Sequence, residues 1–239
     1  MRTVAIIPAR WRSTRFPGKP LAMIAGKPMI EHVWDKACAA QGIDDVIVAT
    51  DDERIAEAVT AFGGRAEMTR ADHACGSDRL AEVAGRIDAE IVINIQGDEP
   101  LVRSSDLAAL AALMRAEPGV RVASLCHPIS ADEAANPSRV KVVCDAAGDA
   151  LYFSRARIPH PRDTTPDHYR QHAGVYAYRR EALLGFAGLP VPIEESVEAL
   201  EQLRFLSAGI AIRMIETAPT GPGVDTPEDV ALVEKLLEN

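Results

Sequence analysis

The chain has 239 residues, a formal net charge of −9 at pH 7 and an apolar content of 47%. This length suffices for one large domain with a sizeable core, and the apolar content is ordinary for a globular protein. The acidic balance argues against a broad nucleic-acid-binding surface, and no apolar run reaches membrane-spanning length. The first residues enter an apolar run directly, without the pattern of a signal peptide, so we expect a cytoplasmic protein.

The four cysteines are scattered without Cys-x-x-Cys spacing, at Cys38, Cys75, Cys126 and Cys144. In a chain of this type we expect free thiols in a reducing compartment. Ligand pairs at the usual zinc spacing are absent, so a zinc site is not favoured.

The first half of the chain alternates buried strands with amphipathic helices. Apolar runs predict strands at residues 4–7, 45–50, 66–68 and 91–95. Helical spacing predicts helices from Pro28 to about residue 42, from a cap at Asp51 to about Phe62, around residues 80–84, and from a cap at Ser104 to about Met114. This βα alternation predicts an α/β fold with a mostly parallel sheet.

The second half adds a hairpin to this pattern. Residues 140–144 and 150–153 form two apolar runs around a turn, and 155–170 read as a long loop. Strands are predicted at 121–126, 174–178 and 211–215, one helix over 194–204, and a last helix from Pro227 to Leu237. We therefore expect a single domain over residues 1–239, with a hairpin excursion at about 139–178.

A basic loop follows the first predicted strand. Residues 8–20 contain three arginines and a lysine, with Ser13 and Thr14 between them. Ligands of open α/β sheets bind beyond the carboxyl ends of the strands, where backbone N–H groups and cations can hold a phosphate. Gly18-Lys19 is followed by Pro20, so this is no Walker loop, and a dinucleotide fingerprint is absent. We expect an anion site, with a solvated basic loop as the alternative.

Two acidic positions form a candidate metal site. Asp98 follows the apolar strand at 91–95, and Asp225 lies in a tight loop before the last helix. Mg²⁺ commonly takes one or two protein carboxylates together with substrate phosphates. Capping of the last helix is the competing interpretation of Asp225, since Thr226-Pro227 follows it.

Several further polar residues are weaker candidates. Ser77 and Arg79 could contact a nucleotide, although Ser77-Asp78 is also a good helix cap. His172 lies at a strand start, where a structural histidine is the commoner case. Glu201 and Gln202 fit a solvated helix face equally well, and Arg155 could bind a second anion such as a carboxylate.

Taken in order, these segments resemble the sugar-acid cytidylyltransferase family, most closely its 3-deoxy-manno-octulosonate (KDO) branch, the CMP-KDO synthetases. The matching segments are Pro8 to Pro20, Asn94 to Pro100, Asp78 to Val83, Tyr152 to Arg155, Leu200 to Arg204 and Gly223 to Asp229. They run from residue 4 to about 230, so the resemblance covers nearly the whole chain.

The resemblance implies a three-layer GT-A/Rossmann-like nucleotidyltransferase fold and a homodimer built largely through the inserted hairpin. It implies transfer of the cytidylyl group of CTP to KDO, for lipopolysaccharide biosynthesis, with Mg²⁺ as cofactor and no nucleic-acid or membrane partner. Arg10, Lys19, Asp98 and Asp225 would act in catalysis, the two aspartates as metal ligands. The nucleotide would contact Arg10, Ser13, Thr14, Arg15, Lys19, Ser77, Arg79 and Gln96. The sugar would contact Arg155, His172, Tyr176, Glu201 and Gln202.

The sequence departs from the family pattern near the expected sugar and dimer regions. Arg12 adds a cation to the basic loop, and residues Ile158 to Arg162 replace the family's usual Ile-Pro-aromatic sequence. The loop from Asp163 to Tyr169 is shorter than is usual in the family, and Val191 to Glu194 replace its usual Ser-Pro-Leu-Glu. An 8-amino or nine-carbon sugar acid is therefore the alternative substrate. A non-catalytic nucleotide-binding protein on the same fold is the alternative from another class, which the retained acids and cations argue against.

Overall fold

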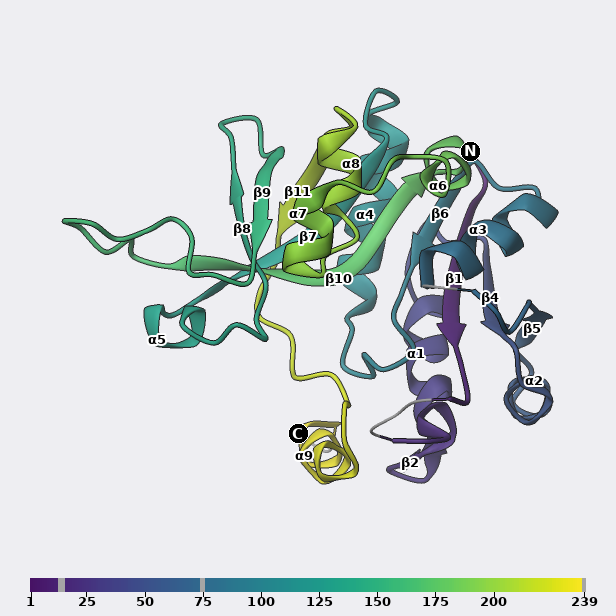
Figure 1. Ribbon diagram of the computed structural model, residues 1–239. Helices are drawn as coiled ribbons and strands as arrows, with labels where there is room; N and C mark the ends of the chain where they lie inside the picture. Colours follow the sequence, from purple (N-terminus) through teal and green to yellow (C-terminus); the bar gives the residue numbers. More distant parts are fainter. Residues whose placement is uncertain (13–15, 74–75, 238–239) are drawn as a thin grey trace.

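A mixed β-sheet runs through the middle of the protein (Figure 1). The structure, a computed structural model, describes residues 1–12, 16–73 and 76–237. Seven strands follow one another across the sheet in the order β11-β7-β10-β6-β1-β4-β5. Their bounds are β1 Thr3–Ala9, β4 Asp45–Thr50, β5 Arg65–Met68, β6 Ile91–Asn94, β7 Val122–Ile129, β10 Tyr169–Arg179 and β11 Ile212–Glu216. Neighbouring strands on this path are parallel, except where β10 pairs with β6 and β7. The predicted mostly parallel α/β sheet is confirmed.

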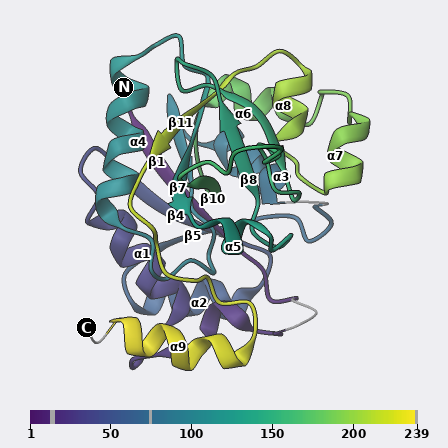
Figure 2. The same ribbon diagram turned by 90° about the vertical axis from the view of Figure 1, so that its left-hand side faces the viewer.

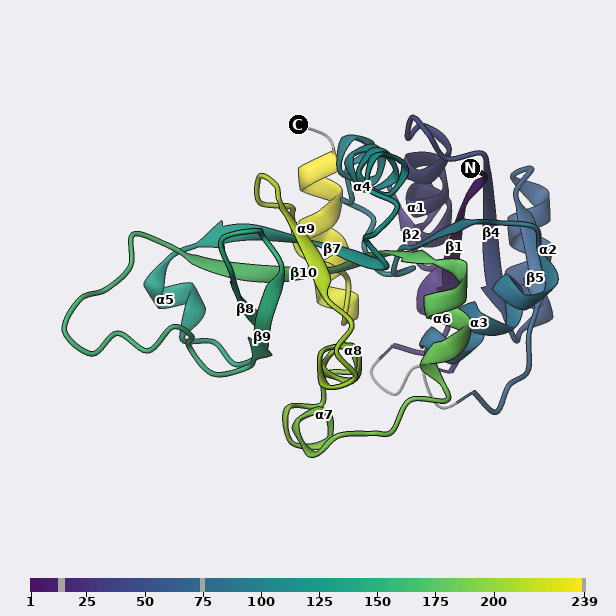
Figure 3. The same cartoon turned by 90° about the horizontal axis from the view of Figure 1, so that it is seen from above.

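Helices cover both faces of this sheet, as the edge-on view of Figure 3 shows. Alternate residues of β1 divide between two cores: Ala5 and Ile7 face one, Val4 and Ile6 the other. The first core is closed by α1 (Met29–Cys38), α2 (Glu53–Ala61) and α4 (Ser104–Ala116). The second is closed by α3 (Gly76–Arg86), α6 (Arg180–Phe186) and α8 (Leu203–Ser207). The three-layer arrangement is therefore the one expected. None of the described helices is long and apolar enough to cross a membrane.

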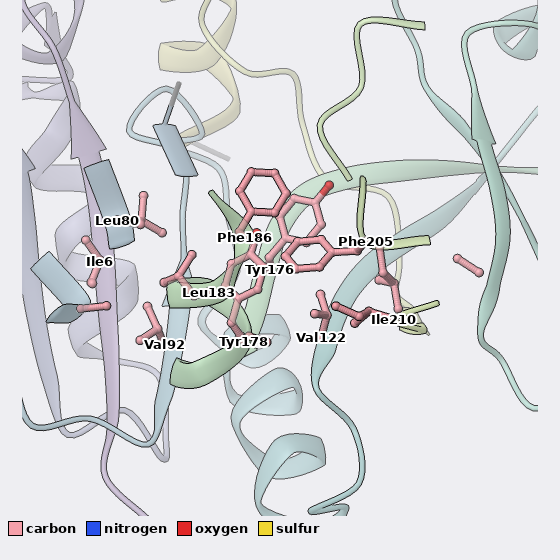
Figure 4. Close-up of a cluster of buried hydrophobic side chains, with 14 of the residues drawn as sticks. Ile6, Leu80, Val92, Val122, Tyr176, Tyr178, Leu183, Phe186, Phe205 and Ile210 are labelled. Carbon is pink, nitrogen blue, oxygen red and sulfur yellow. The ribbon is translucent and has the colours of Figure 1, made fainter. Parts of the chain in front are cut away.

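The second core is rich in aromatic side chains. In Figure 4, the rings of Tyr176, Phe186 and Phe205 lie together beside Tyr178, above the strands. Tyr176 and Tyr178 stack with ring centroids 5.6 Å apart, and Phe186 and Phe205 lie 4.8 Å apart. Large buried rings contribute much of the apolar area that stabilises such a core. This core ends at a polar pocket, described below.

The predicted hairpin extends from the sheet as an arm (Figure 1). Its strands β8 (Lys141–Cys144) and β9 (Ala150–Ser154) pair antiparallel, and Lys141 pairs with Gln171 of β10. The Asp145 carboxylate accepts the N–H groups of Ala147 and Asp149 and so shapes the turn. The short helix α5 (Ala131–Ala134) and the loop after β9 belong to the same part of the molecule.

The last helix, α9 (Pro227–Leu237), returns to the first part of the chain (Figure 2). It packs beside the small sheet of β2 (Met23–Ile24) and β3 (Lys27–Pro28), where Val233 joins Ile24 and Met29 in a separate apolar cluster. The N–H of Ala25 donates to Glu234 Oε1 at 2.8 Å. This contact, with the apolar cluster, anchors α9 beside the small sheet.

Four details differ from the sequence predictions. The helix expected over 194–204 is two short helices, α7 (Ile193–Glu198) and α8, separated at Ala199, which has a φ of 51°. Asp52, not Asp51, caps α2 and accepts the N–H of Arg54. Ser104 is the first residue of α4, and its hydroxyl donates to Lys36 O instead of capping. The helix α3 begins at Gly76, so Ser77 lies inside its first turn.

We expect the Gly97→Ala substitution to destabilise the protein. A Cβ at Gly97 would lie 2.9 Å from the carbonyl oxygen of Pro8, a backbone atom that cannot move aside cheaply. Overpacking of this kind costs about 1–3 kcal/mol, which denaturant unfolding would measure. Gly119→Ala is the control, because nothing lies within 4 Å of the added atom there. Equal stability of the two variants would contradict the close approach.

Candidate active site

A lysine joins the two acidic loops at the carboxyl ends of the central strands. Lys19 opens the short 3₁₀ helix η1 (Lys19–Leu21), directly after Gly18, whose φ of 72° suits glycine. Its ammonium lies 2.6 Å from Asp98 Oδ2, 2.9 Å from Val224 O and 3.8 Å from Asp225 Oδ1. The Lys19 side chain is only 14% exposed, so these contacts are partly shielded from water. The basic loop and both predicted metal ligands therefore meet at one point.

The loop before α9 holds Asp225 in this position. Val224 donates its N–H to Asp98 O at 2.9 Å, which ties this loop to the turn after β6. The Asp229 carboxylate accepts the N–H groups of Asp225 and Thr226, at 2.9 and 2.8 Å. The Asp229 carboxylate therefore anchors the backbone of Asp225 and Thr226 at the start of α9.

A third carboxyl group, that of Glu99, senses the negative charge of this centre. Burial, together with the charges of Asp98 and Asp225, raises the pKa of Glu99 to about 7, although Lys19 acts in the opposite direction. A cation in this region is therefore electrostatically favoured.

Part of the predicted phosphate loop is not described. Arg10 directly follows β1 and is exposed, as expected for a phosphate ligand. Ser13, Thr14 and Arg15 lie outside the described residues, as does Cys75. Their roles stay predictions.

A pocket of about 520 Å³ lies at the end of the aromatic core. All the predicted sugar residues and two of the predicted nucleotide residues line it. Its polar lining comprises Ser77, Asn94, Gln96, Arg155, His172, Tyr176, Glu201 and Gln202. The residues named from the sequence thus come from five separate segments and share one cavity.

An irregularity in β10 shapes the pocket wall that carries His172 and Tyr176. The register between β10 and β7 shifts after Ala173 and resumes at Tyr176. The Ser124 hydroxyl lies 2.8 Å from Val175 O and 3.0 Å from His172 Nε2. The Ser124 hydroxyl of β7 therefore joins the His172 ring to the backbone of the irregular segment.

Burial keeps His172 neutral. It lowers the pKa of this histidine to about 3. The ring contacts Phe153 edge-on at 5.0 Å and Tyr176 at 5.2 Å between centroids. A neutral imidazole suits hydrogen bonding to a hydroxyl better than binding an anion.

Ser77 and Glu201 link the two predicted halves of the site. The Ser77 hydroxyl, at the start of α3, donates to Glu201 Oε2 at 2.9 Å. Gln202 is 7% exposed and precedes α8. The break at Ala199 therefore places Glu201 and Gln202 in the pocket, between two helices and not on a helix face.

Arg155 and Arg79 are both engaged with protein groups. Arg155 lines the pocket, but its guanidinium donates to three backbone carbonyls, the nearest being Glu198 O at 2.7 Å. Arg79 is 4% exposed and donates to Thr69 Oγ1 and, at 3.0 Å, to Asp51 Oδ2. It thereby links the ends of β4 and β5 to α3.

Asn94 is a pocket residue to which the sequence analysis assigned no role. It is 3% exposed, and its Oδ1 is buried without a hydrogen-bond partner in the described part of the chain. Orphaned polar atoms of this kind are uncommon and often mark ligand sites. Its place at the end of an apolar strand, two residues before Gln96, was the available signal.

The acidic centre fits a hard cation. Carboxylate oxygens of Asp98 and Asp225 both lie near one ammonium ion, so two oxygen donors already face one cation. In residues 1–12, 16–73 and 76–237, no group of three or more His, Cys, Asp or Glu side chains is arranged to hold a metal alone. The donor set therefore fits an ion that completes its coordination with phosphates and water.

Comparison with known proteins gives consistent matches. The cytidylyltransferase family model matches residues 4–213. The 3-deoxy-manno-octulosonate cytidylyltransferase of Escherichia coli is 53% identical over 236 residues, covering 99% of this chain and 96% of the relative. That of Myxococcus xanthus is 54% identical over 239 residues, covering 99% and 96%. The solved structure of CMP:2-keto-3-deoxy-manno-octonic acid synthetase complexed with CTP has a TM-score of 0.98 and 52% identity, covering 100% of this chain and 99% of that one.

The fold and the charged centre at the strand ends define a nucleotidyltransferase with a three-layer, Rossmann-like architecture. Within this class, the chain belongs to the cytidylyltransferase family, in the branch of the 3-deoxy-manno-octulosonate cytidylyltransferases.

We expect His172 to contribute to acid destabilisation. An unfolded histidine has a pKa near 6.5, whereas the folded value is about 3. The unfolded state therefore binds more protons between these values, and stability falls as the pH falls through this window. His172→Asn should lose less unfolding free energy than the parent between pH 8 and pH 4.5, measured by urea unfolding. The exposed His160→Asn is the control; an unchanged pH dependence in His172→Asn would contradict the burial of this imidazole.

Proposed function

We propose that this protein transfers the cytidylyl group of CTP to the anomeric hydroxyl of 3-deoxy-D-manno-octulosonate, giving CMP-KDO and pyrophosphate. The observation that carries the proposal is the meeting of Lys19, Asp98 and Asp225 beside a polyhydroxyl-compatible pocket. The relatives that share about half of the sequence are 3-deoxy-manno-octulosonate cytidylyltransferases, which supports the substrate pair. They do not favour an 8-amino or nine-carbon acid.

The reaction joins two anions, so the site must offset their repulsion. The anomeric hydroxyl attacks the α-phosphorus, and pyrophosphate leaves in line. Arg10 and Lys19 bind the triphosphate and stabilise the leaving pyrophosphate, together with Arg15. Ser77, Arg79 and Gln96 lie around the nucleotide. His172, Tyr176, Glu201 and Gln202 orient the sugar hydroxyls, with Arg155 near them.

Asp98 and Asp225 would hold Mg²⁺. When bound, the ion would neutralise phosphate charge and lower the pKa of the attacking hydroxyl. The convergence of the two carboxylates on Lys19 supports this assignment, because they already face one cation. With CTP bound, the Lys19 ammonium would contact the phosphates in place of the two carboxylates.

The functional form is a homodimer in the cytoplasm, supplying an activated sugar acid for lipopolysaccharide. Exposed apolar side chains support a partner surface. Leu151 of β9 and Ile193 and Val197 of α7 are 62%, 70% and 76% exposed. These two elements are joined by the hydrogen bond from Ser154 to Glu198. Large apolar side chains exposed on linked elements are a feature of interaction surfaces.

Pyrophosphate release from CTP, with a panel of sugar acids and Mg²⁺, tests the proposed function. Turnover with the eight-carbon 3-deoxy acid alone is the expected result. Turnover only with an amino or nine-carbon acid would reassign the sugar pocket. CTP binding without pyrophosphate release from any sugar acid would contradict an enzymatic role.

We predict that Lys19→Met increases the affinity of the free protein for divalent ions. Its ammonium competes with a metal for Asp98 and Asp225, and removing a unit charge at this distance should tighten binding about tenfold. Titration of the CTP-free protein with Mn²⁺, followed by calorimetry or electron paramagnetic resonance, measures this directly.

Lys27→Met is the matched control, since Lys27 is exposed and pairs with Glu31 and Asp35 away from the site. Adding Asp98→Asn to Lys19→Met should abolish the gain. Unchanged or weaker Mn²⁺ binding in Lys19→Met would contradict the competition.

A further inference from the structure

The pocket segment with Glu201 and Gln202 depends on an unusual backbone position. Ala199 ends α7 with a φ of 51° and a ψ of 52°, in the left-handed region. This conformation costs a non-glycine residue energy, so surrounding contacts must hold it. The chain then continues through Leu200 to the two pocket residues.

The Glu198 carboxylate attaches this turn to the hairpin arm. Its Oε1 accepts the Ser154 hydroxyl at 2.5 Å, and its Oε2 accepts the Arg155 N–H at 2.8 Å. Both contacts lie at the end of β9, more than forty residues earlier in the chain. Hydrogen bonds to an ionised carboxylate are among the stronger ones in proteins.

Arg155 makes the complementary contacts in the opposite direction. Its Nε donates to Glu198 O at 2.7 Å, and its terminal nitrogens donate to Ala199 O at 3.4 Å and Pro137 O at 3.3 Å. The last carbonyls of a helix lack partners within it, and a cation there satisfies them. Arg155 thus terminates α7 where the sequence pattern alone would continue it.

A buried lysine, Lys141, holds the backbone carbonyl of Arg155. Lys141 of β8 is 0% exposed, and its ammonium donates to Arg155 O at 2.6 Å, Arg139 O at 2.5 Å and Asn136 O at 3.0 Å. All three donors of this cation are therefore used. The hairpin, the Asn136–Arg139 loop and the end of α7 form one connected network.

We propose that Glu198 is a positioning residue for the sugar-acid substrate. Through its contacts with Ser154 and Arg155, Glu198 stabilises the left-handed conformation of Ala199. This conformation places Glu201 and Gln202 in the pocket. The inference rests on the proposed function, because it assigns the sugar acid to this side of the cavity. The nucleotide phosphates bind at Lys19, outside the network, so the two substrates should respond differently.

Glu198→Gln tests this role. If the amide oxygen accepts the Arg155 N–H, the amide nitrogen faces the Ser154 hydroxyl, which must then change from donor to acceptor, and both contacts lose the carboxylate charge. We expect the KM for 3-deoxy-D-manno-octulosonate to rise about tenfold, the scale of losing one hydrogen bond to a charged group. The KM for CTP should change less than about twofold. Steady-state pyrophosphate release, with each substrate varied in turn, gives both values.

The matched control is Glu194→Gln, which makes the same change of charge on an exposed residue of α7. It should leave both KM values unchanged. Equal rises in both KM values for Glu198→Gln, or a lower melting temperature with neither changed, would overturn the positioning role. Failure of the parent protein to use the sugar acid would instead overturn the proposed function.

Ala199→Gly provides a rescue. Glycine adopts the left-handed region without strain, so the turn then needs less support from Glu198. In the Glu198→Gln background it should restore the sugar KM to within about threefold of the parent value. No recovery would count against the turn as the element that Glu198 controls. If Glu198→Gln fails to fold, Ser154→Ala removes one of the two contacts, and a selective rise in the sugar KM is again expected.

Discussion

The structure depends on keeping several carboxylates together at the carboxyl edge of the sheet. Asp98, Glu99 and Asp225 come from two loops that are far apart in the sequence, and their repulsion contributes to the raised pKa of Glu99. Lys19 offsets this repulsion with contacts to both aspartates and to the carbonyl of Val224. The backbone bond from Val224 to Asp98 and the packing of α9 on the small sheet fix the second loop. A site that needs a cation in the absence of ligands is suited to bind both a metal ion and an anionic substrate.

The neighbouring pocket differs from this charged centre, because its polar groups lie at the end of an apolar core. Tyr178, Phe186 and Phe205 provide its apolar lining, while His172 and Glu201 are held by Ser124 and Ser77. Burial keeps His172 neutral, so the pocket offers hydrogen bonds without adding positive charge. The break in β10 and the break at Ala199 both place pocket side chains where regular elements would not.

Local patterns were sufficient for most of the fold. Apolar runs identified the central strands, and the alternation with helices identified the parallel sheet and its carboxyl edge. They failed where distant contacts override local preference. Val197, Leu200, Leu203 and Leu206 have helical spacing, yet Arg155 ends α7 at Glu198, and no local signal in residues 194–204 reveals it. The basic loop, Asp98 and Asp225 were selected because each follows a strand or precedes a helix, whereas the sugar-pocket residues were implied by the family resemblance. The ion pair between Lys19 and Asp98 was not predicted. The two residues are 79 positions apart in the sequence, and their contact depends on the assembled sheet.

The central claim is that Asp98 and Asp225 act on catalysis as one centre, through a shared cation. A double-mutant cycle tests it most directly, with kcat/KM measured for Asp98→Asn, Asp225→Asn and the double variant. If the two carboxylates serve one ion, the double variant should lose little more activity than the more damaging single variant. Losses that multiply fully, as for independent sites, would contradict the account.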